Sequence, residues 1–198
     1  MRLLLASFIF VLLFTIGVLR PIYASNSYNL PDAPSGKIDE ALLKIVPVRF
    51  LPSSPFYFLI WAKENFNRLI KPSPLRKAEF DFVLSGKRLK EAYLLLEKNN
   101  VKNSSAALNR YSRVAEKTVD ELKKAKNQSQ DVATAAGIID GGLLHQLILL
   151  SAIEKKVDSF ANDYNFNTNF SSAIDGFSQI VKEVDQISPG VGDKYLPK

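Results

Sequence analysis

The residues of this chain that could do metal or nucleophilic chemistry begin with a single histidine. His145 is the only histidine, and it lies in Gly141-Gly142-Leu143-Leu144-His145-Gln146. A di-metal site in a helical bundle needs paired Glu-x-x-His motifs, which the sequence lacks. A zinc site built on one histidine would need carboxylates or water as its remaining ligands. We therefore interpret His145 as an ordinary core or edge residue, and we expect no metal site.

Two carboxylates, Glu64 and Glu91, are the remaining candidates for catalysis. General acid–base chemistry needs two carboxyl groups with separated pKa values in a cleft, as in enzymes that cleave polymers. The chain contains no cysteine, which removes thiol catalysis, thiolate zinc sites and iron–sulfur clusters. We expect no catalytic residue, no cofactor and no enzymatic activity, and we keep a carboxylate-based enzyme acting on envelope polymers as the rival hypothesis.

The charge of the chain is mildly basic. Its 198 residues carry a formal net charge of +6. Basic and acidic residues alternate, as in Lys87-Arg88-Leu89-Lys90-Glu91. A nucleic-acid-binding protein would usually show a clustered basic face. We therefore expect no nucleic-acid partner, and the expected partner is an unknown envelope protein or polymer.

The first 24 residues predict export. Arg2 precedes an apolar run from Leu3 to Leu19, and Ala24 offers a cleavage site. The run is longer than a typical signal core and close to the minimum for a spanning helix. Residues 1–24 are therefore a signal peptide or an uncleaved anchor that tethers the chain through residues 3–19. Either alternative predicts an extracytoplasmic protein, secreted or anchored to the cytoplasmic membrane and facing outward.

The remaining sequence predicts an all-α fold, an antiparallel bundle of about four to five long helices behind the export segment. Apolar residues recur at alternating spacings of three and four, and no strand-like alternation is sustained. We expect a spacer with a short amphipathic segment over 25–49, a helical domain over 50–188 and a flexible tail over 189–198. The long helices are expected over about 55–70, 74–98, 104–126, 131–164 and 170–187.

The segment before the first long helix has a distinctive pattern. Leu51-Pro52-Ser53-Ser54-Pro55-Phe56-Tyr57 leads into Trp61 and Glu64, and Arg88-Leu89-Lys90-Glu91-Ala92 follows on the next helix. The arrangement resembles the DUF5667 family, an exported bacterial helical domain of unknown function, over roughly residues 50 to 125. Ser85-Gly86 departs from the family pattern. The resemblance marks as structural or interaction residues Pro52, Ser54, Pro55, Phe56, Tyr57, Trp61, Glu64, Arg88 and Glu91.

This aromatic lead-in has two interpretations. Pro52 and Pro55 restrict the backbone, and Ser54 could cap the helix with Pro55 at its first position, so that the aromatic side chains clamp the bundle. Alternatively they form a pocket or surface for a partner, because they exceed what one helix face can bury. Glu64 and Arg88 lie on successive helices, and we expect them to pair and set the register of packing.

Small residues recur every fourth position at Ala133, Gly137 and Gly141. This spacing predicts a tight helix crossing, with a homodimer contact as the alternative. Gly141-Gly142 could equally kink the helix. Taken together, the sequence predicts a non-catalytic, envelope-associated interaction or scaffold module. A small-molecule or metal-sensing module is the alternative, with the enzyme as the weaker rival.

Overall fold

The computed structural model describes residues 30, 35–157 and 163–196. Every regular secondary-structure element within these residues is a helix, which confirms the all-α prediction. The predicted export segment 1–24 and residues 25–29 and 31–34 of the predicted spacer lie outside the described residues. The helices are α2 (Ser35–Lys44), α3 (Tyr57–Leu69), α4 (Pro74–Glu97), α5 (Val101–Asn127), α6 (Val132–Val157), α7 (Tyr164–Ile187) and α8 (Val191–Tyr195).

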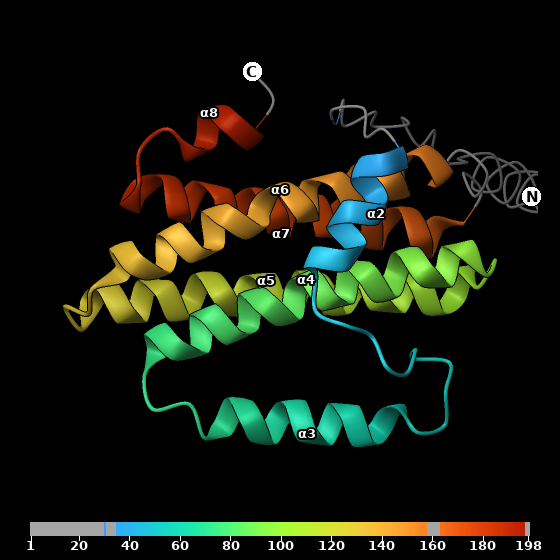
Figure 1. The fold of residues 1–198 in the computed structure, drawn as a ribbon, viewed down its shortest axis with the longest axis horizontal. Helices are drawn as coiled ribbons and strands as arrows, with labels where there is room; N and C mark the ends of the chain where they lie inside the picture. Colours follow the sequence, from blue (N-terminus) through green and yellow to red (C-terminus); the bar gives the residue numbers. More distant parts are fainter. Residues whose placement is uncertain (1–29, 31–34, 158–162, 197–198) are drawn as a thin grey trace, which may run out of the picture.

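The body of the protein is a bundle of four long helices in two layers (Figure 1). Helices α4 and α5 lie side by side, α6 packs on α4, and α7 packs on α5. Their apolar stripes meet in one core, in which Leu89, Tyr111, Leu143 and Phe177 are almost completely buried. Burial of these stripes stabilises the helices, because isolated helices are marginal in water.

Helix boundaries follow capping residues that the sequence only partly revealed. Ser73 accepts a hydrogen bond from the Arg76 backbone N–H at 3.3 Å and caps α4, as the pattern predicts. Helix α5 begins earlier than predicted, because Asn100 is its cap. Asp163 caps α7, so the predicted start near residue 170 is wrong, and residues 165–169, between the two predicted helices, are helical.

The Ser85-Gly86 departure from the family pattern has a local explanation. The Ser85 hydroxyl accepts a hydrogen bond from Gln146 Nε2 at 3.0 Å and donates to the carbonyl of Phe82 at 2.7 Å. Tyr111 donates its hydroxyl hydrogen to Gln146 Oε1 at 2.9 Å. A side chain on Gly86 would contact Gln146 and Ile45. The two small residues therefore accommodate a buried amide and the end of α2.

The stripe of small residues on α6 does not mediate the predicted tight crossing. Ala133, Gly137 and Gly141 are exposed, and a Cβ atom placed on either glycine would meet nothing within 4 Å. The close approach occurs instead at Gly142, where a Cβ atom would lie 2.5 Å from the ring of Phe82 on α4. The register of α6 against α4 decides which glycine faces its neighbour.

The short helices α2 and α8 extend the bundle on the α6–α7 side (Figure 1). Ala41 of α2 and Ile45 directly after it are buried, and Lys90 of α4 donates to the carbonyl groups of Leu42 and Ile45 at this end of α2. A cation is favourable at a helix C-terminus. Although the sequence suggested a flexible tail over 189–198, residues 191–195 are helical, and Val191 is 1% exposed.

Among the described helices, α6 is the one long and apolar enough to cross a membrane by composition. Most of its apolar window is buried in the bundle, which is typical of a core helix. Phe160, which was predicted to continue its apolar stripe, lies outside the described residues.

Candidate functional site: the charged interface of helix α3

Helix α3 lies apart from the bundle, along the outer side of α4 (Figure 1). The Ser54 hydroxyl accepts a hydrogen bond from the Phe56 N–H at 3.3 Å, and the helix begins at Tyr57 without a side-chain cap. It therefore starts two residues later than the predicted Ser54 cap with Pro55 at the first position. Tyr57, Glu64 and Arg68 recur at positions i, i+7 and i+11, which places them on one face of the helix.

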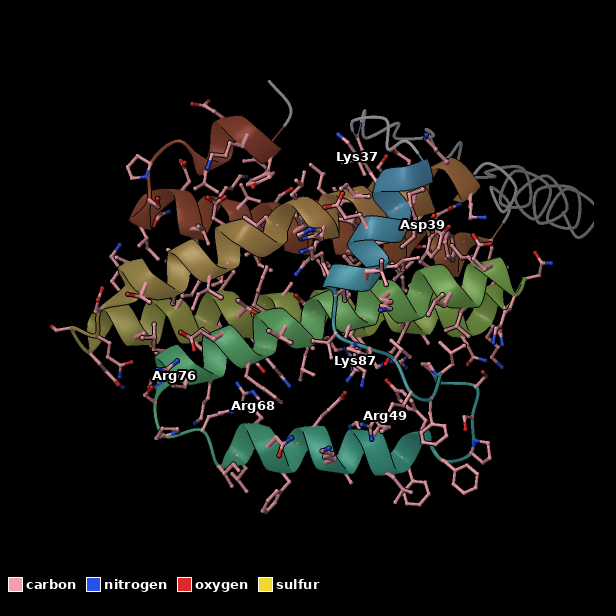
Figure 2. The ribbon with its side chains drawn as sticks, in the orientation of Figure 1. Lys37, Asp39, Arg49, Arg68, Arg76 and Lys87 are labelled. Carbon is pink, nitrogen blue, oxygen red and sulfur yellow. The ribbon has the colours of Figure 1, made fainter. Side chains whose placement is uncertain are left out.

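The predicted pair between Glu64 and Arg88 is present and buried. Glu64 accepts hydrogen bonds from both Arg88 and Lys87 of α4. Figure 2 shows Lys87 between the two helices. These three residues are each less than 10% exposed. A buried carboxylate that binds two cations is costly to disrupt, because removing one partner leaves uncompensated charge.

Arg88 extends this ion pair to a second carboxylate, Glu91, which is 0% exposed. Arg88 Nη1 donates to Glu91 Oε1 at 2.8 Å and to the Tyr57 hydroxyl at 2.7 Å, and Tyr57 donates to Glu91 Oε2 at 2.9 Å. Burial raises the pKa of Glu91, and Arg88 offsets only part of this rise. Burial and the nearby Glu91 carboxylate also raise the pKa of Tyr57. Tyr57 therefore stays protonated and joins α3 to α4.

A second ion-pair cluster holds the other end of α3. Arg68 Nε donates to both carboxylate oxygens of Asp81 at 2.9 Å, and Arg68 Nη2 donates to Glu121 of α5 at 3.0 Å. Asp81 is 1% exposed, and burial raises its pKa although Arg68 lowers it. Arg68 lies between α3 and the bundle in Figure 2. Polar and charged side chains therefore attach α3 at both ends.

This interface accounts for the carboxylates that were considered for catalysis. Glu64 and Glu91 are close together, but Arg88 lies between them and binds both. Neither residue lines the two surface hollows described below. The arrangement attaches α3 to α4 structurally, and cations neutralise each carboxylate.

Apart from the half-buried Ile60, the large apolar side chains of α3 and its ends are exposed. Tyr57 is the half-buried member of the aromatic lead-in, whereas Trp61 and Phe58 are 58% and 63% exposed. The clamp interpretation therefore fits Tyr57 but not its aromatic neighbours. We call this surface the outer apolar face. It comprises Phe56, Phe58, Leu59, Trp61, Phe66, Leu69 and Ile70.

Two open hollows are lined by other residues. One follows the segment before α3, between Val48 and Ser54, and reaches Leu94 and Lys98 of α4. The other lies between α5 and the start of α7 and is basic. Two nitrogens of its Arg110, Nε and Nη2, are buried without a hydrogen-bond partner in the described part of the chain, and the guanidinium lies 5.5 Å from the Tyr57 ring centroid.

No group of three potential metal ligands occurs among the residues that the structure describes. His145 lies half-buried on α6, as expected for an edge residue.

Sequence reasoning identified Glu64, Arg88 and Glu91 but missed Lys87, Arg68, Asp81 and Glu121. A signal was present on the second long helix, where Asp81, Arg88 and Glu91 recur at spacings of seven and three. These residues form a charged stripe beside the apolar one. Charged residues are usually expected on the solvent side of a helix, so this stripe was not predicted to form an interface.

The family model described as "Domain of unknown function (DUF5667)" matches residues 49–139, which confirms the predicted resemblance. The matched segment contains α3, α4, α5 and the first part of α6, and thus the whole charged interface. No curated protein and no solved structure shows significant similarity to this chain.

Proposed function

We propose that this chain is a non-catalytic interaction module of the bacterial cell envelope, located on the outer side of the cytoplasmic membrane, and that it binds its partner through α3. The orientation of α3 carries the proposal. A surface helix normally turns its apolar stripe inward, whereas α3 turns Glu64 and Arg68 inward and exposes Trp61, Phe66 and Leu69.

This inversion supports an interaction surface. Contiguous apolar patches rimmed by polar residues mark sites of binding, whereas single exposed apolar residues are ordinary. Seven large exposed apolar side chains lie on α3 and at its ends, and aromatic residues are enriched at interfaces. The buried ion pairs fix the helix in this orientation.

Two further features support a binding role in the envelope. The apolar sequence from Leu3 to Leu19 supports export. The carboxylates Glu64 and Glu91 support binding over catalysis, because Arg88 binds both and leaves neither free to transfer a proton.

In-cell photo-cross-linking tests the binding face. A benzophenone amino acid replaces Phe66 in the full chain, and a matched variant carries it at Ile138 on α6, which is also exposed. The proposal expects a cross-linked product, with protein or lipid, from position 66 and little from position 138. No product at position 66, or equal products at both positions, would overturn it.

Because the chain contains no cysteine, a single introduced thiol can report on which side of the membrane the domain lies. A Lys126→Cys variant carries one thiol at an exposed position on α5. An impermeant maleimide added to intact spheroplasts should label this thiol as fully as it does after lysis. Labelling that requires lysis would place the domain inside the cell and contradict the proposal.

A further inference from the structure

We infer that the partner of the outer apolar face is an anionic lipid surface. This inference rests on the proposed function and names the chemistry of the partner. It follows from three features of the described residues: the charges around α3, the residue types on its outer face, and the way in which α3 is held.

The exposed charges in the segment that carries α3 are all positive. Residues 45–78 contain six basic residues and one acidic residue, Glu64, which is buried against Lys87 and Arg88. Arg49 and Lys63 are exposed. Glu79, just beyond this segment, is paired with Arg76. The outer apolar face therefore lies in a positive field without an exposed carboxylate of its own, which complements an anionic surface.

The same charges disfavour a second copy of the chain as the partner. In a two-fold dimer through this face, Lys63 and Arg49 of one copy would approach the same positive residues of the other copy. Like charges at an interface oppose association. A bilayer with anionic headgroups would attract these residues and admit the apolar side chains.

The residue types also suit the boundary between headgroups and acyl chains. Interfacial helices place tryptophan, phenylalanine and leucine in this region and basic residues beside them. Trp61, Phe58, Phe66 and Leu69 provide the apolar side chains, and Lys63 lies beside them on the exposed surface.

The attachment to the bundle changes the energetics of docking. Many interfacial helices fold only when they bind, and this ordering weakens their affinity. Here Glu64, Arg68 and Tyr57 hold α3 as a helix in advance, so this ordering cost is already met by the fold. The apolar face is presented without rearrangement of the domain.

Docking of α3 would also orient the domain. Contact of α3 with the membrane would place α4 and α5 next to the bilayer and turn α6, α7 and α8 away from it.

The single tryptophan of the chain makes the inference measurable. Trp61 lies four residues after Tyr57, at the border between the charged face and the outer apolar face, and it is 58% exposed. All tryptophan emission therefore reports on the exposed surface of α3. The full chain is reconstituted in phosphatidylglycerol vesicles or in neutral phosphatidylcholine vesicles, each with brominated acyl chains. The inference expects a shift of emission to shorter wavelength and strong bromine quenching in the anionic vesicles only, weakening as salt is added.

Substitutions distinguish lipid docking from other partners. Lys63→Gln should lower the ratio of docked to undocked protein about fivefold, because each basic residue near an anionic surface contributes about 1 kcal/mol. Lys126→Gln, at an exposed position on α5, is the matched control and should leave the ratio unchanged. Equal quenching in neutral vesicles, or none in either, would overturn the inference.

The outcomes also separate this inference from the proposed function. Protein adducts at position 66 without lipid quenching would retain the interaction module and refute the lipid partner. A concentration-dependent shift of Trp61 emission without vesicles would identify a second copy. A shifted Trp61 emission that is present without vesicles, does not depend on concentration and is lost when residues 3–19 are deleted would identify that segment as the occupant. Either result would overturn the lipid inference.

Discussion

The four-helix body and helix α3 are stabilised in opposite ways. In the body, α4 to α7 bury apolar side chains such as Phe177 and Leu143 in one core. At α3, charged side chains are buried and apolar ones are exposed. Apolar burial is non-directional and tolerates small shifts, whereas buried ion pairs require a defined geometry. The difference indicates that the body provides stability and that the α3 interface provides orientation.

The largest expected effect tests the apolar body. Phe177→Ala should lower the free energy of unfolding by about 3–5 kcal/mol, because it removes a buried ring and leaves a cavity. Trp61→Ala removes an aromatic side chain from α3 that is 58% exposed, and it should change stability by less than about 0.5 kcal/mol. Urea denaturation measures both. Similar losses from the two variants would abolish the contrast between the regions.

The second expected effect tests the ion pairs of α3. Glu64→Ala leaves Lys87 and Arg88 without their shared carboxylate, and it should cost about 3 kcal/mol. Hydrogen exchange should rise in residues 57–69 and remain unchanged in α7. The control, Glu79→Ala, removes a pair with the exposed Arg76 and should cost less than about 1 kcal/mol. Exchange that rises uniformly through the bundle would show that α3 is not a separate unit.

The third prediction tests how closely the body is packed. Gly142→Ala would place a methyl group against the buried ring of Phe82, and we expect a loss of about 1–3 kcal/mol in the free energy of unfolding. Gly141→Ala, one position earlier, meets no atom within 4 Å and should gain about 0.5–1 kcal/mol in helix propensity. Thermal melts compare the two variants, and equal melting temperatures would contradict the register of α6.

The smallest expected effect is a dependence on pH at Glu91. Burial holds the pKa of this carboxyl above its ordinary value near 4.5. The contribution of Glu91 to stability is therefore fully present below that ordinary value and is lost as the pH rises through the folded-state pKa. The melting temperature of the wild type should fall relative to Glu91→Gln as the pH rises from about 4 to about 8. A difference that grows in the opposite direction would show that Arg88 outweighs burial.

The sequence predicted the body well because its signals are local. Apolar spacings of three and four placed the helices, and Ser73 with Pro74 marked the start of α4. The start of α7 was misplaced because the asparagine-rich segment around residue 167 was taken for a turn, although Asp163 caps a helix there. Cap residues and turn residues share the same chemistry, so local composition could not separate them.

The candidate site was predicted only in part. The positions of Glu64 and Arg88 on successive helices predicted that the two residues pair, and the structure contains this ion pair. The cluster of Arg68, Asp81 and Glu121 was not predicted, because these residues come from three different helices. The sequence of one helix does not determine how that helix is rotated against its neighbours. The contact of Gly142 with Phe82 likewise depends on how α6 is rotated against α4.

The sequence alone determined that several amphipathic helices must bury their apolar stripes together without a disulfide, because periodicity and the absence of cysteine are properties of the chain. Only the tertiary structure decided that α3 would be attached by its charges and turn its aromatic residues outward. An amphipathic helix can bury either face when the neighbouring surface supplies matching partners, and Asp81, Lys87, Arg88 and Glu91 of α4 supply them.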